Sequence, residues 1–288
     1  MIGGGDWVAT PEQLIEQGRG GELPALLQQD SGGGDSEASY RLAVLHARGA
    51  YMRKDWPRAL DLLALSVDQG CAQARTELAL ISTAEDHDRP FGSREVRKLC
   101  DAPRVHQIDG FLSAEVCEFL IDQGRNRLRP AGTLERDASG ARVRTVSDHR
   151  TNSAIAMSLF DGGVIMALIA ERISRVLKVS TGVFEAAQIF HYAAGQEFRP
   201  HVDYIEGAAV QRIATFLVYL NDDFDGGETW FPYVDLRART KKGGAVFFHN
   251  VDDAGAPDPM SVHAGTAPTS GEKWLLSQWV RDQPYMGD

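Results

Sequence analysis

The 288-residue sequence predicts an α+β protein, in which a small all-α region at residues 1–100 precedes a β-rich domain at residues 101–288. Two observations lead to this prediction. Apolar residues recur at three-and-four spacing between residues 37 and 83, which is typical of amphipathic helices. Beyond residue 105, short β-rich runs separated by turn residues replace that period, and such runs favour a barrel or two-sheet jelly roll with helices packed outside.

The helical region carries small residues where helices would approach closely, among them Ala43, Gly49, Ala59 and Ala74. This pattern resembles a tetratricopeptide-like helical-hairpin repeat. Only about one and a half units are present, fewer than the three or so that a free-standing array of repeats needs, so we expect the helices to lean on the following domain. Two roles stay open, namely a helical cap that stabilises its neighbour and a surface that recruits substrate or joins protomers.

The second region divides into short elements that turn residues punctuate. We expect a strand at residues 105–111, a helix that Ser113 caps, a long loop or hairpin over residues 127–150, and a helix over Gly163–Leu177. Five further strands are predicted at residues 187–192, 214–220, 244–249, 261–264 and 273–280.

Composition excludes several classes of function. The net charge of −10, from 30 basic and 40 acidic residues, offers no basic surface for a phosphate backbone and argues against nucleic-acid binding. No apolar run approaches the roughly 18 residues of a membrane span, and the N-terminus lacks the features of a signal peptide. Three widely spaced cysteines indicate neither a disulfide framework nor a zinc cluster. We therefore expect a cytoplasmic protein.

The triplet His201-Val202-Asp203 is the first candidate for chemistry. On a strand, residues two apart point to the same face, so the imidazole and the carboxylate would converge. His263, in a later strand-like run, is the candidate third ligand. Two imidazoles and one carboxylate on one face of an octahedron leave three positions open, which suits non-haem Fe(II) better than zinc.

The run that begins at Lys273 is the second candidate. Period two places Lys273, Leu275, Ser277 and Trp279 on one face of a strand. An inward lysine is costly unless an anion such as the distal carboxylate of 2-oxoglutarate meets it. The alternative is that Lys273 lies at the strand edge in water.

Seven short blocks follow one another in order at residues 190–196, 200–203, 212–222, 226–232, 242–248, 263–265 and 271–274. This series, with an upstream block at residues 108–113, resembles the prolyl 4-hydroxylase family of Fe(II)/2-oxoglutarate dioxygenases over residues 105–285. The resemblance implies a double-stranded β-helix, the jelly roll of that family.

The resemblance also implies roles for individual residues. His201, Asp203 and His263 would be the iron ligands. Lys273 would bind the distal carboxylate of 2-oxoglutarate, together with Thr229 and Tyr192. The expected substrate contacts are Arg150, Ser153, Glu185, Arg212 and Trp279.

The function that the resemblance implies is hydroxylation of peptidyl proline at carbon 4, with succinate and CO2 as co-products. Fe(II), 2-oxoglutarate and O2 would take part, with ascorbate as reductant, and the partner would be a proline-containing peptide or protein. Phe198, where many members have tyrosine, and the short segment 204–210 leave open the same chemistry on a free amino acid or a non-proline side chain. A non-catalytic binding scaffold is the alternative of another class. The physiological substrate and the number of subunits do not follow from the sequence.

Overall fold

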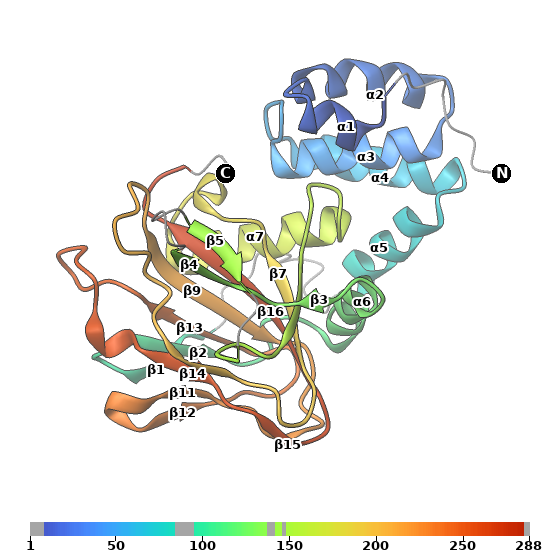
Figure 1. Ribbon diagram of the computed structural model, residues 1–288. Coiled ribbons are helices and arrows are strands. Elements are labelled where there is room, and N and C mark those ends of the chain that lie inside the picture. Colours follow the sequence, from blue (N-terminus) through green and yellow to red (C-terminus); the bar gives the residue numbers. More distant parts are fainter. Residues whose placement is uncertain (1–8, 84–94, 137–141, 146–147, 285–288) are drawn as a thin grey trace. The chain divides into compact units, whose positions relative to one another are not determined.

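The computed structural model describes residues 9–83, 95–136, 142–145 and 148–284 (Figure 1). The chain forms two compact units, one of residues 1–92 and 159–173 and the other of residues 93–158 and 174–288. This division departs from the expected boundary after residue 100. A later segment, residues 159–173, returns to the helical unit because its apolar side completes the core of that unit.

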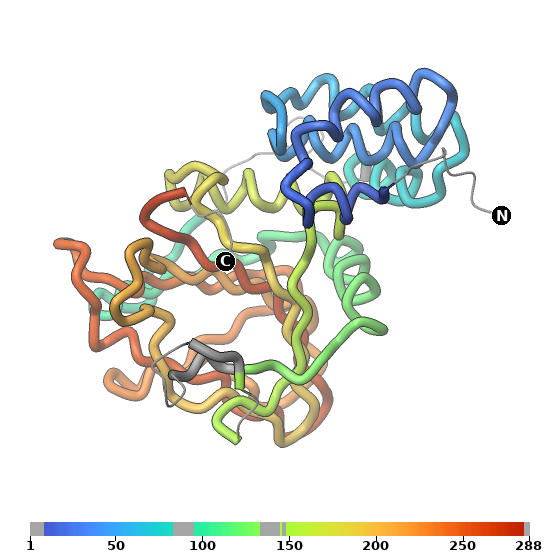
Figure 2. The backbone as a smooth tube through the Cα atoms, turned by 45° about the horizontal axis from the view of Figure 1, so that its top comes forward, coloured from blue at the N-terminus to red at the C-terminus, as the bar shows by residue number. Residues whose placement is uncertain are grey.

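The first unit is all-helical, and its course can be followed from the blue end of the chain in Figure 2. Its elements are α1 (Pro11–Glu16), η1 (Gly20–Glu22), α2 (Leu23–Gly32), α3 (Ser36–Arg48), α4 (Trp56–Asp68), α5 (Ala72–Thr83) and most of α7 (Gly163–Leu177). The side chains of Asp35 and Asp55 cap α3 and α4. Helices α3 to α5 and α7 confirm the helices that the apolar period predicts. The short helices α1 and α2 were not predicted, although Thr10 and Gln13 form a capping box at α1.

The start of α7 is fixed by a buried polar cluster. The Glu77 carboxylate accepts hydrogen bonds from the Tyr40 hydroxyl at 2.6 Å and from the backbone N–H of Val164 at 2.8 Å. Gly163, at φ +52°, lies so close that an added Cβ would be 2.1 Å from the Tyr40 hydroxyl oxygen and 2.2 Å from a Glu77 oxygen. Val164 and Ala167 of α7 then enter the hydrophobic core of the unit. The helices were expected to lean on the following domain; the segment that completes their core, residues 159–173, belongs instead to their own unit.

The second unit contains two larger antiparallel sheets. The eight-stranded sheet has the order β1-β2-β13-β9-β16-β7-β6-β3 and the four-stranded sheet the order β12-β11-β14-β8. Strands of the larger sheet are β1 (Arg97–Cys100), β2 (Val105–Ile108), β3 (Arg129–Pro130), β6 (Ser153–Ala156), β7 (Gln188–Tyr192), β9 (Arg212–Tyr219), β13 (Ala245–His249) and β16 (Lys273–Arg281). Those of the smaller sheet are β8 (Phe198–His201), β11 (Thr229–Phe231), β12 (Leu236–Ala238) and β14 (His263–Gly265).

The two sheets face each other, as the jelly roll requires. The Tyr219 hydroxyl of β9 lies 3.0 Å from the Thr229 hydroxyl of β11, and the rings of Phe231 and Phe248 meet edge to face at 5.1 Å. The remaining elements are α6 (Ala114–Arg125), which Ser113 caps as expected, the pairs β4 (Thr133–Arg136) with β5 (Arg142–Thr145) and β10 (Asp225–Gly226) with β15 (Pro268–Ser270), and η2 (Thr181–Val183), η3 (Pro232–Val234) and η4 (Pro259–Ser261).

The five strands predicted beyond residue 187 are confirmed within two residues at each end, although residue 261 ends η4, whereas the strand predicted at 105–111 ends three residues early, at Ile108. A long loop or a hairpin was predicted over residues 127–150, and the paired strands β4 and β5 show that this segment contains a hairpin. Residues 137–141 and 146–147 lie outside the described residues. The polar stretch from residue 83 to 93, whose composition suggests a linker, also lies almost wholly outside them. None of the described helices has the length and apolar character that crossing a bilayer requires.

We predict that Gly163→Ala destabilises the protein by more than about 2 kcal/mol, because the new methyl group collides with the Tyr40–Glu77 pair and forces a left-handed backbone on a non-glycine residue. Chemical denaturation measures the loss. The matched control is Gly21→Ala in the same unit, where an added Cβ meets nothing within 4 Å. Equal stability of the two variants would contradict this account of how α7 is fixed.

Candidate active site

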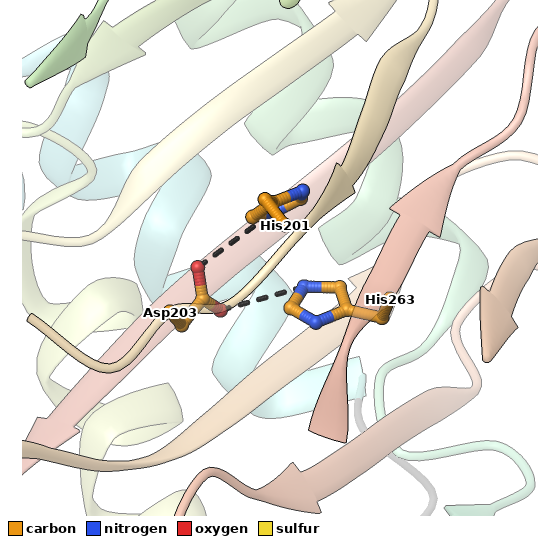
Figure 3. Close-up of side chains that lie close together, drawn as sticks. All are labelled: His201, Asp203 and His263. Carbon is orange, nitrogen blue, oxygen red and sulfur yellow. Dashed lines mark ion pairs between the residues drawn. The ribbon is translucent and has the colours of Figure 1, made fainter. Parts of the chain in front are cut away.

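The side chains of His201 and Asp203 converge with that of His263, which is distant in sequence (Figure 3). His201 ends β8 and pairs directly with His263, which begins the neighbouring β14. Asp203 lies between them, with one oxygen 3.7 Å from Nε2 of His201 and the other 3.6 Å from Nε2 of His263. Among the described residues, this is the one group of three or more His, Cys, Asp and Glu side chains whose ligand atoms lie near enough to share a metal, all within 4.8 Å.

The reason for the convergence differs from the expected one. β8 ends at His201, so Asp203 is not on the strand and the alternation of a strand does not explain its direction. Its carboxylate is held instead by the larger sheet, where the Thr215 hydroxyl of β9 donates to Asp203 Oδ2 at 2.5 Å. The two-residue spacing therefore correctly predicted that His201 and Asp203 converge, but the reason given for it, the alternation of a strand, was wrong.

Backbone carbonyls orient both imidazoles. Nδ1 of His201 lies 2.8 Å from the carbonyl oxygen of Arg199, and Nδ1 of His263 lies 3.0 Å from that of Ser261. Because a carbonyl only accepts, each Nδ1 carries the proton and each Nε2 presents a lone pair toward the shared centre. This tautomer is the one that a metal ligand requires.

Protonation states also fit a metal. Burial, followed by the neighbouring His263, lowers the pKa of His201, so its imidazole is neutral at neutral pH. Burial alone would raise the pKa of Asp203, but His263 and His201 oppose that effect, and the net pKa is lowered, which keeps the carboxylate charged. Two imidazoles and one carboxylate are the donors that a non-haem Fe(II) site uses.

Aromatic rings pack around the ligands. The Phe198 ring stacks on the His201 imidazole with centroids 3.4 Å apart, and Phe248 lies 4.4 Å from the His263 ring. The Phe198 ring, which has no hydroxyl group, thus covers the side of the His201 imidazole that points into the cavity. The departure noted in the sequence lies directly at the metal site.

A cavity that is partly open to solvent contains the three ligands. Its lining is Phe190, Tyr192, Phe198, His201, Asp203, Thr215, Leu217, Thr229, His263, Gly265, Lys273, Leu275, Ser277 and Trp279. All three residues expected at 2-oxoglutarate, namely Lys273, Thr229 and Tyr192, therefore line the same cavity as the expected iron ligands.

Lys273 is completely buried, which excludes the alternative of a strand edge in water. Its Nζ donates to the carbonyl oxygen of Gly227 at 3.0 Å and lies 4.1 Å from the centre of the Tyr192 ring. Burial lowers the pKa of Lys273 to about 7, since the charge of Glu228 offsets the desolvation of the amine only in part. An anionic ligand would supply the missing charge.

The expected substrate contacts are distributed unevenly. Trp279 lines the cavity, while Arg150 lies buried between the Phe190 and Phe198 rings, 4.7 and 4.6 Å from their centres. Ser153, on β6, is half-buried and outside the lining. Direct contact of Arg150 and Ser153 with a substrate stays a prediction.

Glu185 and Arg212 are outside the cavity lining and pair with each other, and their contact with a substrate stays a prediction. Both oxygens of Glu185 pair with Arg212, at 2.6 and 2.8 Å, and Arg281 lies 2.6 Å from one of them. The Arg212 guanidinium also stacks 3.7 Å from the centre of the Trp279 ring. Glu185 is thus engaged within the protein, and the cluster positions Trp279. Sequence reasoning missed Arg281, since no local signal indicates an ion pair across the sheet.

Comparisons with known proteins agree with this site. Residues 187–281 match the family model described as the 2OG-Fe(II) oxygenase superfamily. Prolyl 4-hydroxylase 1 of Arabidopsis thaliana is 33% identical over 201 residues, which cover 63% of this chain and 70% of that protein. Prolyl 4-hydroxylase 13 of the same plant is 29% identical over 220 residues, covering 69% and 79%.

Solved structures are similar too. The viral collagen prolyl hydroxylase of Paramecium Bursaria Chlorella virus-1, in a 2OG complex, matches with a TM-score of 0.49 and 27% identity. That match covers 64% of this chain and 98% of the viral one.

We predict that His201→Ala and Asp203→Ala each abolish the rise in melting temperature that Fe(II) produces under argon, because either change removes one of three ligands. At a metal concentration of a hundred times Kd, the wild-type stabilisation should be about 2.7 kcal/mol. Asp225→Asn, which alters an exposed carboxylate away from the cavity, is the control. A full thermal shift in the His201 or Asp203 variant would remove the metal assignment.

We predict that binding of 2-oxoglutarate takes up a proton at about pH 8 and almost none at about pH 6. With a pKa of about 7, Lys273 is mostly neutral at the higher pH and must be protonated to meet the carboxylate, so the affinity falls by up to about tenfold per pH unit above pH 7. Calorimetry in buffers of different ionisation enthalpy measures the uptake. In Lys273→Arg, which stays charged, the uptake should vanish; uptake that persists there would come from another group.

Proposed function

Because the chain belongs to the prolyl 4-hydroxylase family of 2OG-Fe(II) oxygenases, we propose that it hydroxylates proline residues of a peptide or protein at carbon 4. Fe(II), 2-oxoglutarate and O2 are required, and succinate and CO2 are released with the hydroxylated product. The observation that carries the proposal is that the His201–Asp203–His263 group and the buried amine of Lys273 line one cavity.

Bound iron and 2-oxoglutarate supply the hard chemistry, the reductive activation of O2 to an oxidant that attacks an unactivated C–H bond. The residues of this chain bind and orient. His201, Asp203 and His263 would hold the iron on one side and leave the other side open. Lys273 would fix the distal carboxylate of 2-oxoglutarate by a charge-assisted hydrogen bond, beside Thr229 and Tyr192.

Trp279 is the best supported of the substrate contacts. Its ring lines the cavity and is 6% exposed, and its indole N–H has no hydrogen-bond partner among the described residues. A peptide carbonyl would satisfy that donor. The ion pair of Glu185 with Arg212 would act on the substrate indirectly. Arg212 lies over the Trp279 ring and keeps that ring in place.

Two alternatives are weighed against this proposal. The same chemistry on a free amino acid or a non-proline side chain is favoured by Phe198, whose stacking on His201 makes the substrate side of the cavity more apolar than a tyrosine would. A non-catalytic scaffold is disfavoured, because burying a lysine and three ligand side chains together is costly for a protein that binds no metal or co-substrate.

The remaining expectations extend the proposal. We predict that the enzyme requires ascorbate as reductant and that it is located in the cytoplasm. We also predict that the helical unit binds a protein partner or a second copy of the chain. In the helical unit, the packing of Val164 and Ala167 into the core supports a stabilising role for the repeats.

The test is an assay of succinate release over a panel of proline-containing peptides, free proline and proline-free peptides. We expect release to depend on Fe(II) and on a peptide with proline, and mass spectrometry to find one added oxygen atom on that proline. Proline that carries deuterium at carbon 4 should lose one deuterium. Product on free proline alone would favour the first alternative, and no turnover of any compound by the Fe(II)-loaded protein would favour the scaffold.

A further inference from the structure

Ser277 is a buried hydroxyl in the cavity wall that no group of the described residues satisfies. It lies on β16, is 1% exposed and lines the cavity, and its Oγ has no hydrogen-bond partner among the described residues. Buried polar groups in native proteins are nearly always paired, and leaving one unpaired costs free energy. The missing partner is therefore expected to belong to a ligand.

The other small hydroxyls of the wall differ from Ser277 in this respect. Thr215 donates to Asp203 and accepts from the Asn250 amide at 3.1 Å, and Thr229 lies 3.0 Å from the Tyr219 hydroxyl. Among the three Ser and Thr side chains that line the cavity, the orphan is thus Ser277.

The strand register locates Ser277 along the cavity. On β16, Trp279 pairs with Thr215, which holds the metal ligand Asp203, so this level marks the metal end. Lys273 marks the opposite, distal end. Ser277 is two residues from Trp279, or about 7 Å, and four residues from Lys273, or about 13 Å. Its hydroxyl therefore faces the ligand near the metal and away from the end that Lys273 holds.

Depth distinguishes between the two ligands that could supply the partner. A peptide must enter from solvent, whereas Ser277 is only 1% exposed in the cavity wall and pairs with Leu217 in the register. A small molecule that fills the space between the metal and Lys273 would place its metal-chelating end next to Ser277.

We propose that the Ser277 hydroxyl forms a hydrogen bond with the 1-carboxylate of 2-oxoglutarate, the end that chelates the metal, and so orients the chelate. This inference rests on the proposed use of 2-oxoglutarate and adds a positioning residue at its second end. Lys273 and Ser277 lie on the same face of one strand. Lys273 would then bind the distal carboxylate of the co-substrate and Ser277 the 1-carboxylate.

The test compares two ligands on the Fe(II)-loaded protein under argon, where no turnover occurs. Levulinate keeps the keto group and the distal carboxylate but has a methyl group in place of the 1-carboxylate. Titration calorimetry gives the Kd of 2-oxoglutarate, and competition gives that of levulinate. Ser277→Ala should weaken 2-oxoglutarate by about 10- to 100-fold, the range for a hydrogen bond to a charged group, and change levulinate by less than about twofold.

Ser270→Ala, an exposed serine of the same unit that is outside the cavity lining, is the control and should change neither affinity. Because both ligands bind the same folded variant, a general disturbance would weaken them equally, and that result would overturn the inference. Unchanged affinity for 2-oxoglutarate would overturn it too, as would a loss confined to peptide binding. If the wild-type protein failed to bind 2-oxoglutarate, the proposed function would fall with it, whereas the first three results leave that function intact.

Discussion

Charge balance inside the cavity is the constraint on which the rest of the site depends. The Asp203 carboxylate and the Lys273 amine are both buried, and they lie at opposite ends of the same enclosed space. One carboxylate, one protonated amine, a divalent metal and a dicarboxylate sum to zero charge, so the interior is neutral when both ligands are present. A buried charge without compensation is strongly unfavourable, which makes metal and co-substrate part of the electrostatics of the folded domain.

The jelly roll supplies this arrangement by placing the two ends of the cavity on different sheets. His201 and His263 belong to the smaller sheet and Lys273 to the larger one, and the Thr215–Asp203 hydrogen bond joins them. Every second side chain of β16 points into the cavity, so these side chains would meet the co-substrate at regular intervals along its length. A rigid sheet positions such groups more accurately than loops would.

Much of this was accessible from the sequence, for definite reasons. The alternation along β16 placed Lys273 on one face with Ser277 and Trp279, because a long apolar strand has one predictable period, but it left open whether the amine is inward or at the strand edge. The pairing of His201 with His263 was not accessible, since it depends on the register of two strands sixty residues apart. Ser277 shared the predicted face of Lys273, but its significance appears only once the partners of the neighbouring hydroxyls are known. The period likewise identified α7 as a helix, yet it could not identify the core that receives Val164 and Ala167.

The order of segments along the chain has a consequence for how the protein behaves when it is cut. Residues 159–173 belong to the helical unit, although they are flanked on both sides by segments of the other unit. A protease that nicks the chain between residues 83 and 95 would therefore not release the N-terminal helices, which would stay bound to the second fragment through the apolar side of α7 and the Glu77 contact with Val164. Two such fragments, mixed after separation, are a natural system for reconstitution, and a gene shortened to begin at residue 93 would encode a helix whose apolar side has lost its neighbours.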